Sequence, residues 1–137
     1  METINLKWKE NMAFSSEIDG HIIHIDSLKE HGGEGKGIRP KPLLLTALAG
    51  CSGMDVVSIL KKMKIELKDF NIKVEAELTT EYPKYYNKIH LTYEFWGDNL
   101  PFAKLDKAIR LSQDQYCGVS AMLRKAADIS YEIKIMD

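Results

Sequence analysis

Apolar and polar residues alternate in three short segments near the beginning of the chain. The alternation runs through residues 4–9, where isoleucine, leucine and tryptophan fall on one side of an extended segment and polar residues fall on the other. A period of two residues is typical of a half-buried β-strand. Two further apolar segments, at 12–14 and 21–25, are separated by Asp19-Gly20, a pair that favours a tight hairpin turn. The pattern predicts a three-stranded antiparallel meander.

A glycine-rich segment and then a long apolar segment follow this meander. Residues 31–37 hold four of the nine glycines, which makes regular structure there entropically expensive, so we predict a loop. The eighteen residues 43–60 carry one charge, Asp55, and are followed by two lysines, which suit the negative end of a helix. We predict a buried helix rather than a membrane span, because Asp55 lies near its middle and no aromatic residue anchors its ends.

The second half of the chain alternates again and then takes on helical spacing. Residues 70–78 and 89–95 predict two antiparallel strands, and residues 129–135 predict a last strand. Between them we expect a helix beginning near Pro101 and a second, short helix from about Cys117. The buried positions expected for these helices are Leu105, Ala108 and Ile109 in the first and Val119, Met122, Leu123 and Ala126 in the second.

These elements give the order β-β-β-α-β-β-α-α-β, an α+β fold with a long buried central helix, and we expect residues 1–137 to form a single domain. The central helix is apolar all the way round. One sheet covers only one side of such a helix, and two short helices cannot cover the rest. We therefore expect an obligate homodimer in which the central helices of two subunits pack on each other.

The charge balance excludes several classes of partner. Nineteen Lys and Arg residues face twenty Asp and Glu residues, for a formal net charge of -1, so no excess of basic charge is available for nucleic acid or for an anionic membrane surface. The first residues lack the basic and apolar regions of a secretory signal. We therefore expect a cytoplasmic protein whose two cysteines are reduced thiols.

Cys51 and Cys117 are the candidate chemical groups. Their separation of 66 residues fits neither a zinc site nor a thioredoxin-like motif. Small residues flank Cys51 in the long helix and would leave its sulfur reachable, although a buried structural thiol is the alternative.

Cys117 is expected in the first turn of its helix, on the side opposite the apolar positions, with Ser112 or Asp114 as the cap. The positive end of the helix dipole would there lower the pKa of the Cys117 thiol. The alternative is an incidental, partly exposed cysteine.

The four histidines do not suggest a metal site. His21 and His24 point to opposite faces of a strand, and His31 and His90 have no ligand at a useful spacing. We expect no metal and no cofactor.

Two segments resemble the OsmC/Ohr family, the osmotically inducible and organic hydroperoxide resistance proteins. The first is RPKPLLLTALAGCS, residues 39–52, and the second surrounds Tyr116-Cys117-Gly118-Val119. The resemblance implies a homodimer with active sites at the subunit interface. It also implies thiol peroxidase activity in which Cys51 reduces an organic hydroperoxide and becomes a sulfenic acid. Cys117 then forms a disulfide with Cys51, and an unidentified dithiol reduces the pair.

The chain departs from the peroxidases of this family at the residues that activate the first cysteine. Lys41 occupies the position of their glutamate, and residues 1–38 contain no arginine, so Arg39 is the candidate for the activating positive charge. In this respect the chain is similar to the OsmC-like branch. The alternative function is a noncatalytic dimeric module that binds an apolar or acyl ligand in the interface groove.

Overall fold

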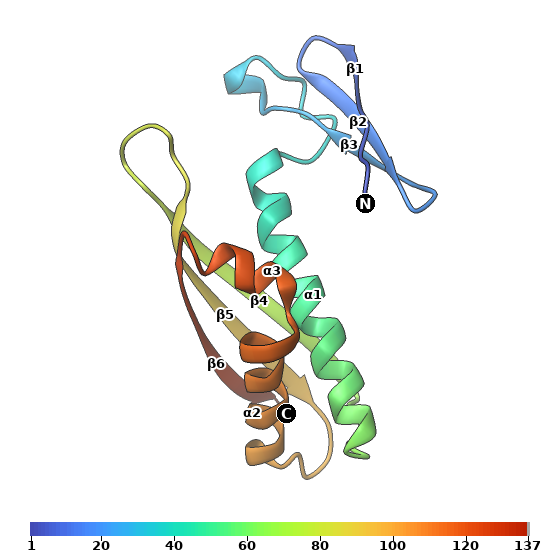
Figure 1. Ribbon diagram of the computed structural model, residues 1–137, viewed down its shortest axis with the longest axis vertical. Coiled ribbons are helices and arrows are strands. Elements are labelled where there is room, and N and C mark those ends of the chain that lie inside the picture. The colour runs from blue at the N-terminus through green and yellow to red at the C-terminus, as the bar shows by residue number, and fades with distance from the viewer. Residues whose placement is uncertain (137) are drawn as a thin grey trace. The chain divides into compact units, whose positions relative to one another are not determined.

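The computed structural model describes residues 1–136 and divides the chain into two compact units, Met1–Leu44 and a second one from Leu45 onward (Figure 1). The first unit contains β1 (Leu6–Glu10), β2 (Ala13–Ile18), β3 (His21–Ile25), the short 3₁₀ turn η1 (Lys29–His31) and the start of α1 (Pro40–Lys62). The second contains β4 (Asp69–Leu78), β5 (Tyr86–Trp96), α2 (Phe102–Leu111), the π-helical turn η2 (Ser112–Tyr116), α3 (Gly118–Leu123) and β6 (Asp128–Met136). The α+β class is confirmed; the single domain stays a prediction.

The first unit is the predicted antiparallel meander, in the order β1-β2-β3. Asp19 and Gly20 form the turn between β2 and β3, and both have positive φ angles, of 53° and 80°. A turn that requires this conformation at two successive residues favours the Asp-Gly pair found there.

The glycine-rich loop of the first unit is organised by one buried carboxylate. Asp26 accepts hydrogen bonds from the backbone N–H groups of Ser27 at 2.7 Å, Lys36 at 3.1 Å and Glu34 at 3.3 Å. These bonds, above all those from Lys36 and Ser27, hold the pKa of Asp26 below its ordinary value. The Asp26 side chain therefore fixes the backbone of a loop whose glycines are conformationally free.

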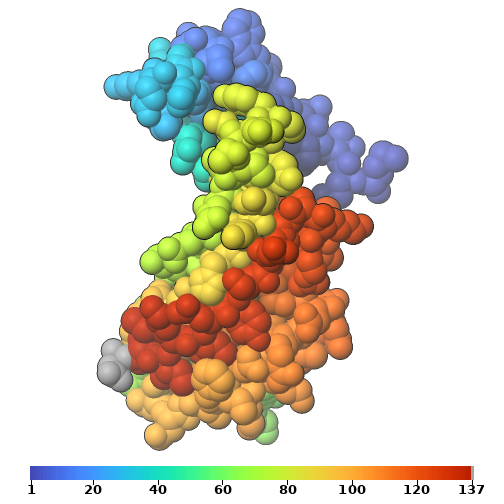
Figure 2. Space-filling view, turned by 90° about the vertical axis from the view of Figure 1, so that its left-hand side faces the viewer, coloured from blue at the N-terminus to red at the C-terminus, as the bar shows by residue number. Residues whose placement is uncertain are grey.

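The second unit is a three-stranded sheet with helices on one face (Figure 1). Its order is β4-β5-β6, with β4 antiparallel and β6 parallel to β5. Leu91, Tyr93 and Phe95 of β5 are fully buried beneath the helices, because alternate residues of a strand face the same side. Polar residues take the other face, where β6 is visible in dark red in Figure 2. The predicted buried positions of α2 are confirmed: Leu105, Ala108 and Ile109 are all fully buried.

Helix α1 buries one side and exposes the other. Its buried residues, Leu48, Ser52, Val56 and Leu60, follow one another every fourth position and pack into the core of the second unit. On the other side Met54 is 76% exposed and Val57 is 48% exposed. Within one chain the long helix is therefore half covered.

Helix α3 differs from the prediction. It ends at Leu123, and Met122, expected in the core, is 66% exposed. Ala126, also expected to be buried, lies after the helix and is exposed. The expected spacing assumed a helix of at least eight residues, but α3 has six, so these positions do not form one continuous stripe.

Candidate functional site

Cys51 and Cys117 are far apart in sequence but meet in the second unit. Cys51 is half-buried on α1, and Cys117 is buried immediately before α3. Both are free thiols, and Cys51 is one of the groups that raise the pKa of Cys117, so the two side chains are neighbours. The fold thus brings the two predicted cysteines to the same part of the second unit.

Cys117 corrects two predictions. It is 3% exposed rather than directed away from the core, and burial raises the pKa of its thiol to about 11, whereas a lowered pKa was expected. The neighbouring Cys51 thiol and the negative charge of Asp55 raise the pKa of Cys117 further, while the hydrogen bond from the N–H of Ser120 lowers it.

The reason for this difference lies in the backbone of Cys117. The residue is not inside the helix but is its N-cap, with an extended conformation of φ −76° and ψ 102°, and its sulfur accepts the N–H of Ser120 at 3.3 Å. Helical spacing therefore does not give its direction. The expected caps, Ser112 and Asp114, belong instead to η2.

A buried polar network lies beside the two thiols. Its centre is the Tyr93 hydroxyl, which lies 2.6 Å from Ser52 Oγ and accepts a hydrogen bond from Gln113 Nε2 at 2.8 Å. Burial raises the pKa of Tyr93, so its side chain is a protonated, neutral hydroxyl at neutral pH. Ser52 directly follows Cys51 on α1, so the network includes the residue next to the first cysteine in sequence.

Ser112 connects the same network to Asp55 and to Cys117. Its hydroxyl contacts Ser52 Oγ and donates to Asp55 Oδ2, both at 2.9 Å, and its carbonyl accepts the N–H of Cys117 at 2.7 Å. Asp55 lies one helical turn after Cys51 on α1. Asp55, the one charged residue between positions 43 and 60, is therefore part of this network.

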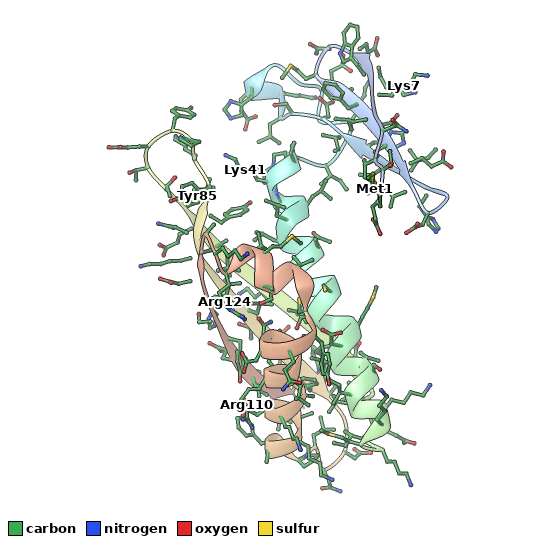
Figure 3. All side chains as sticks on the ribbon, in the orientation of Figure 1. Met1, Lys7, Lys41, Tyr85, Arg110 and Arg124 are labelled. Atoms are coloured by element: carbon green, nitrogen blue, oxygen red, sulfur yellow. The ribbon has the colours of Figure 1, made fainter. Side chains whose placement is uncertain are left out.

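Ser120 and Arg124 complete the network on the α3 side. Ser120 Oγ donates to Gln113 Oε1 at 2.6 Å, and Arg124 donates to the Gln113 carbonyl at 2.7 Å and to Ser120 Oγ at 3.1 Å. Figure 3 labels Arg124 at the end of α3. The sequence analysis did not identify Gln113 as a site residue, because η2 is a polar segment whose inward positions follow neither helical nor strand spacing.

Arg39 and Lys41 are exposed at the start of α1, in the first unit (Figure 3 labels Lys41). The role of Arg39 in activating a thiol stays a prediction.

The exposed side of α1 borders a groove of about 780 Å³ in the second unit. Its apolar lining comes from α1 and β4 and includes Ala49, Met54, Val57, Phe70 and Ile72. This surface is the same one that a single chain leaves uncovered.

Sequence and structure comparisons place these features in a known group of proteins. Residues 33–132 match the model of a family described as OsmC-like protein. The chain belongs to this OsmC-like family. Protein YhfA of Escherichia coli strain K12 is 35% identical over 132 residues, which cover 96% of each chain.

Solved structures of family members share the fold. A hypothetical protein from Aquifex aeolicus is 32% identical with a TM-score of 0.84, covering 100% of this chain and 98% of that one. An organic hydroperoxide resistance protein OsmC from Legionella pneumophila is 20% identical with a TM-score of 0.71, covering 98% of each chain. Helix α1 is long and apolar enough to cross a membrane, a property that core helices of soluble proteins share.

Proposed function

We propose that this protein is a cytoplasmic thiol peroxidase that reduces organic hydroperoxides through Cys51 and Cys117. The observation that carries the proposal is the proximity of the two free thiols, one half-buried and the other buried. The structural likeness to a protein named for organic hydroperoxide resistance supports the same chemistry.

The different surroundings of the two thiols support different roles. Burial and the raised pKa keep Cys117 protonated at neutral pH, so Cys51, which is more accessible, is the nucleophile. The Cys51 thiolate attacks the distal peroxide oxygen, the O–O bond breaks, and the alkoxide leaves and takes up a proton as the alcohol. Cys51 is oxidised to a sulfenic acid.

Cys117 completes the reaction. Its sulfur attacks the sulfur of the Cys51 sulfenic acid, the S–O bond breaks, and the hydroxyl leaves with the thiol proton as water. The product is a Cys51–Cys117 disulfide. A dithiol, whose identity is not assigned, reduces this disulfide and returns both thiols.

The active form is proposed to be a homodimer. The support is the exposed side of α1, where Met54 and Val57 border an apolar groove. A second copy that covers this groove would place apolar surface near Cys51, which favours organic over hydrogen peroxide.

The test is to add an organic hydroperoxide to reduced protein, count the remaining thiols and map the disulfide. We expect two thiols to be lost per chain and a Cys51–Cys117 bond to form, and we expect Cys51→Ser, which keeps only Cys117, to lose its single thiol far more slowly. If the wild type keeps both thiols, or if Cys51→Ser loses thiol as fast as the wild type, the proposal fails.

The groove also supports the second candidate, a module that binds an apolar or acyl ligand without catalysis. Such a module would copurify with a ligand, detectable by native mass spectrometry, and would leave both thiols unreacted in the same titration.

A further inference from the structure

Gln113 is a buried polar residue with no chemical role in the proposed reaction. It is 6% exposed, yet both ends of its side-chain amide are hydrogen-bonded. Nε2 donates to the Tyr93 hydroxyl at 2.8 Å and lies 3.4 Å from Ser52 Oγ, and Oε1 accepts from Ser120 Oγ at 2.6 Å. A buried amide satisfied at both ends has one well-defined orientation.

The two ends of this amide lead to the two thiols. On one side, Ser52 directly follows Cys51 on α1. On the other side, Ser120 contacts Gln113 through its hydroxyl and donates its backbone N–H to Cys117 Sγ at 3.3 Å. One side chain therefore connects Ser52, the sequence neighbour of Cys51, to Ser120, whose N–H donates to Cys117 Sγ.

The segment that carries Cys117 needs such a connection. Cys117 has an extended backbone between η2 and α3, and α3 has only six residues, so little regular structure fixes it. Tyr93, by contrast, lies in the central strand of the sheet and is fully buried. Through its hydrogen bonds to Tyr93 and Ser120, Gln113 thus links the segment around Cys117 to the central strand β5.

We propose that Gln113 is a positioning residue that holds Cys117 beside Cys51 and thereby sets the rate at which Cys117 captures oxidised Cys51. Disulfide formation requires a narrow range of distances between the two side chains, so a small displacement lowers the rate of closure. The inference rests on the proposed function only for the identity of the oxidant. The positioning of the two thiols is the same for any oxidant.

Oxidised glutathione provides a test that needs no peroxide. The Cys51 thiolate attacks glutathione disulfide, forms a mixed disulfide and releases one glutathione thiolate. The Cys117 thiol then attacks the Cys51 sulfur, the second glutathione leaves with the proton, and the Cys51–Cys117 disulfide forms. The two steps are followed separately by quenching with acid and weighing the mixed and internal disulfides by mass spectrometry.

The variant Gln113→Met keeps the volume of the side chain and removes its hydrogen bonds. We expect closure of the internal disulfide to slow on the order of tenfold, and the mixed disulfide to form at the wild-type rate. Gln115→Met is the matched control, because Gln115 lies two residues away in η2 and is exposed; it should leave both steps unchanged. Wild-type closure in Gln113→Met would overturn the inference.

A second variant keeps the test decisive if Gln113→Met does not fold. Ser120→Ala removes the hydroxyl that contacts Gln113 but keeps the backbone N–H that donates to Cys117 Sγ. It also removes the hydrogen bond that this hydroxyl accepts from Arg124, and it should slow closure by roughly threefold or more. Closure at the wild-type rate in folded Ser120→Ala would also contradict the inference.

The peroxide arm separates this inference from the proposed function. If an organic hydroperoxide does not oxidise the wild type, the peroxidase proposal fails, while the glutathione result still decides the role of Gln113. If the peroxide does react, Gln113→Met should accumulate Cys51 sulfenic acid, trapped by dimedone, and overoxidise to sulfinic acid. Equal trapping in wild type and Gln113→Met would contradict positioning by Gln113.

Discussion

At the scale of single residues, the environment of Cys117 controls its titration. Its thiol pKa is raised from 9.0 to about 11, first by burial and then by the neighbouring Cys51 thiol and the charge of Asp55. The unfolded chain loses this proton at a lower pH than the folded chain does. The free energy of unfolding should therefore be insensitive to Cys117 below pH 9.0 and should fall between pH 9.0 and about 11.

Urea unfolding of the reduced protein across this pH range measures the effect. Because burial also raises the pKa of Tyr93 and raises that of Tyr131 to about 12, the informative quantity is the difference between wild type and Cys117→Ser. The variant keeps the tyrosines and should lose part of the decline. Identical slopes in the two proteins would show that Cys117 has the same pKa folded and unfolded.

The pairing of Cys51 and Cys117 as candidates could be predicted from sequence, but their surroundings could not. Small residues around Cys51 and the resemblance of both motifs indicated the pair, and the structure brings the pair together. The direction of Cys117 depends on one extended backbone conformation at a helix cap, which helical spacing does not describe. Gln113 has no periodic signal at all, because its contacts come from three elements that are distant in sequence.

At the scale of elements, prediction was most accurate where one period persists. The strands β4, β5 and β6 alternate over nine or more residues and were predicted to within a few residues of their ends. The parallel pairing of β6 with β5 was not predicted, because periodicity shows which face a residue takes and not which strand is its neighbour.

The loop of the first unit offers a test at this scale. Asp26→Asn removes the charge that accepts three backbone N–H groups, so the amides of Glu34 and Lys36 should exchange with solvent roughly tenfold faster, measured by NMR. In the wild type the lowered pKa means that this stabilisation is present above pH 3.8 and is lost as the pH falls through the folded pKa.

Glu34→Gln is the matched control for this loop. Its carboxylate is exposed and pairs only with the Lys36 side chain, at 2.9 Å, so neutralising it should leave amide protection unchanged. Equal exchange in the Asp26 and Glu34 variants would mean that Asp26 does not order the loop.

At the scale of the whole molecule, the exposed side of α1 is the feature that the fold of one chain leaves unexplained. The helix is apolar on every side, yet Met54 is 76% exposed and borders the groove with Val57 and Phe70. A contiguous exposed apolar surface on a helix that is apolar on every side is typical of an interface between subunits. The sequence predicted this need for a second copy from the length and uniform hydrophobicity of the helix.

Met54→Lys should dissociate the proposed dimer. A lysine inside an apolar interface loses its hydration without gaining a partner, at a cost on the order of 3 kcal/mol or more, which raises the dissociation constant at least a hundredfold. Sedimentation velocity at micromolar concentration should show a dimer for the wild type and a shift toward monomer for the variant. Met122→Lys is the control, since Met122 is similarly exposed, at 66%, but lies on α3 and outside the groove. A folded wild-type monomer at micromolar concentration would contradict the dimer, because the exposed side of α1 would then be stable in water.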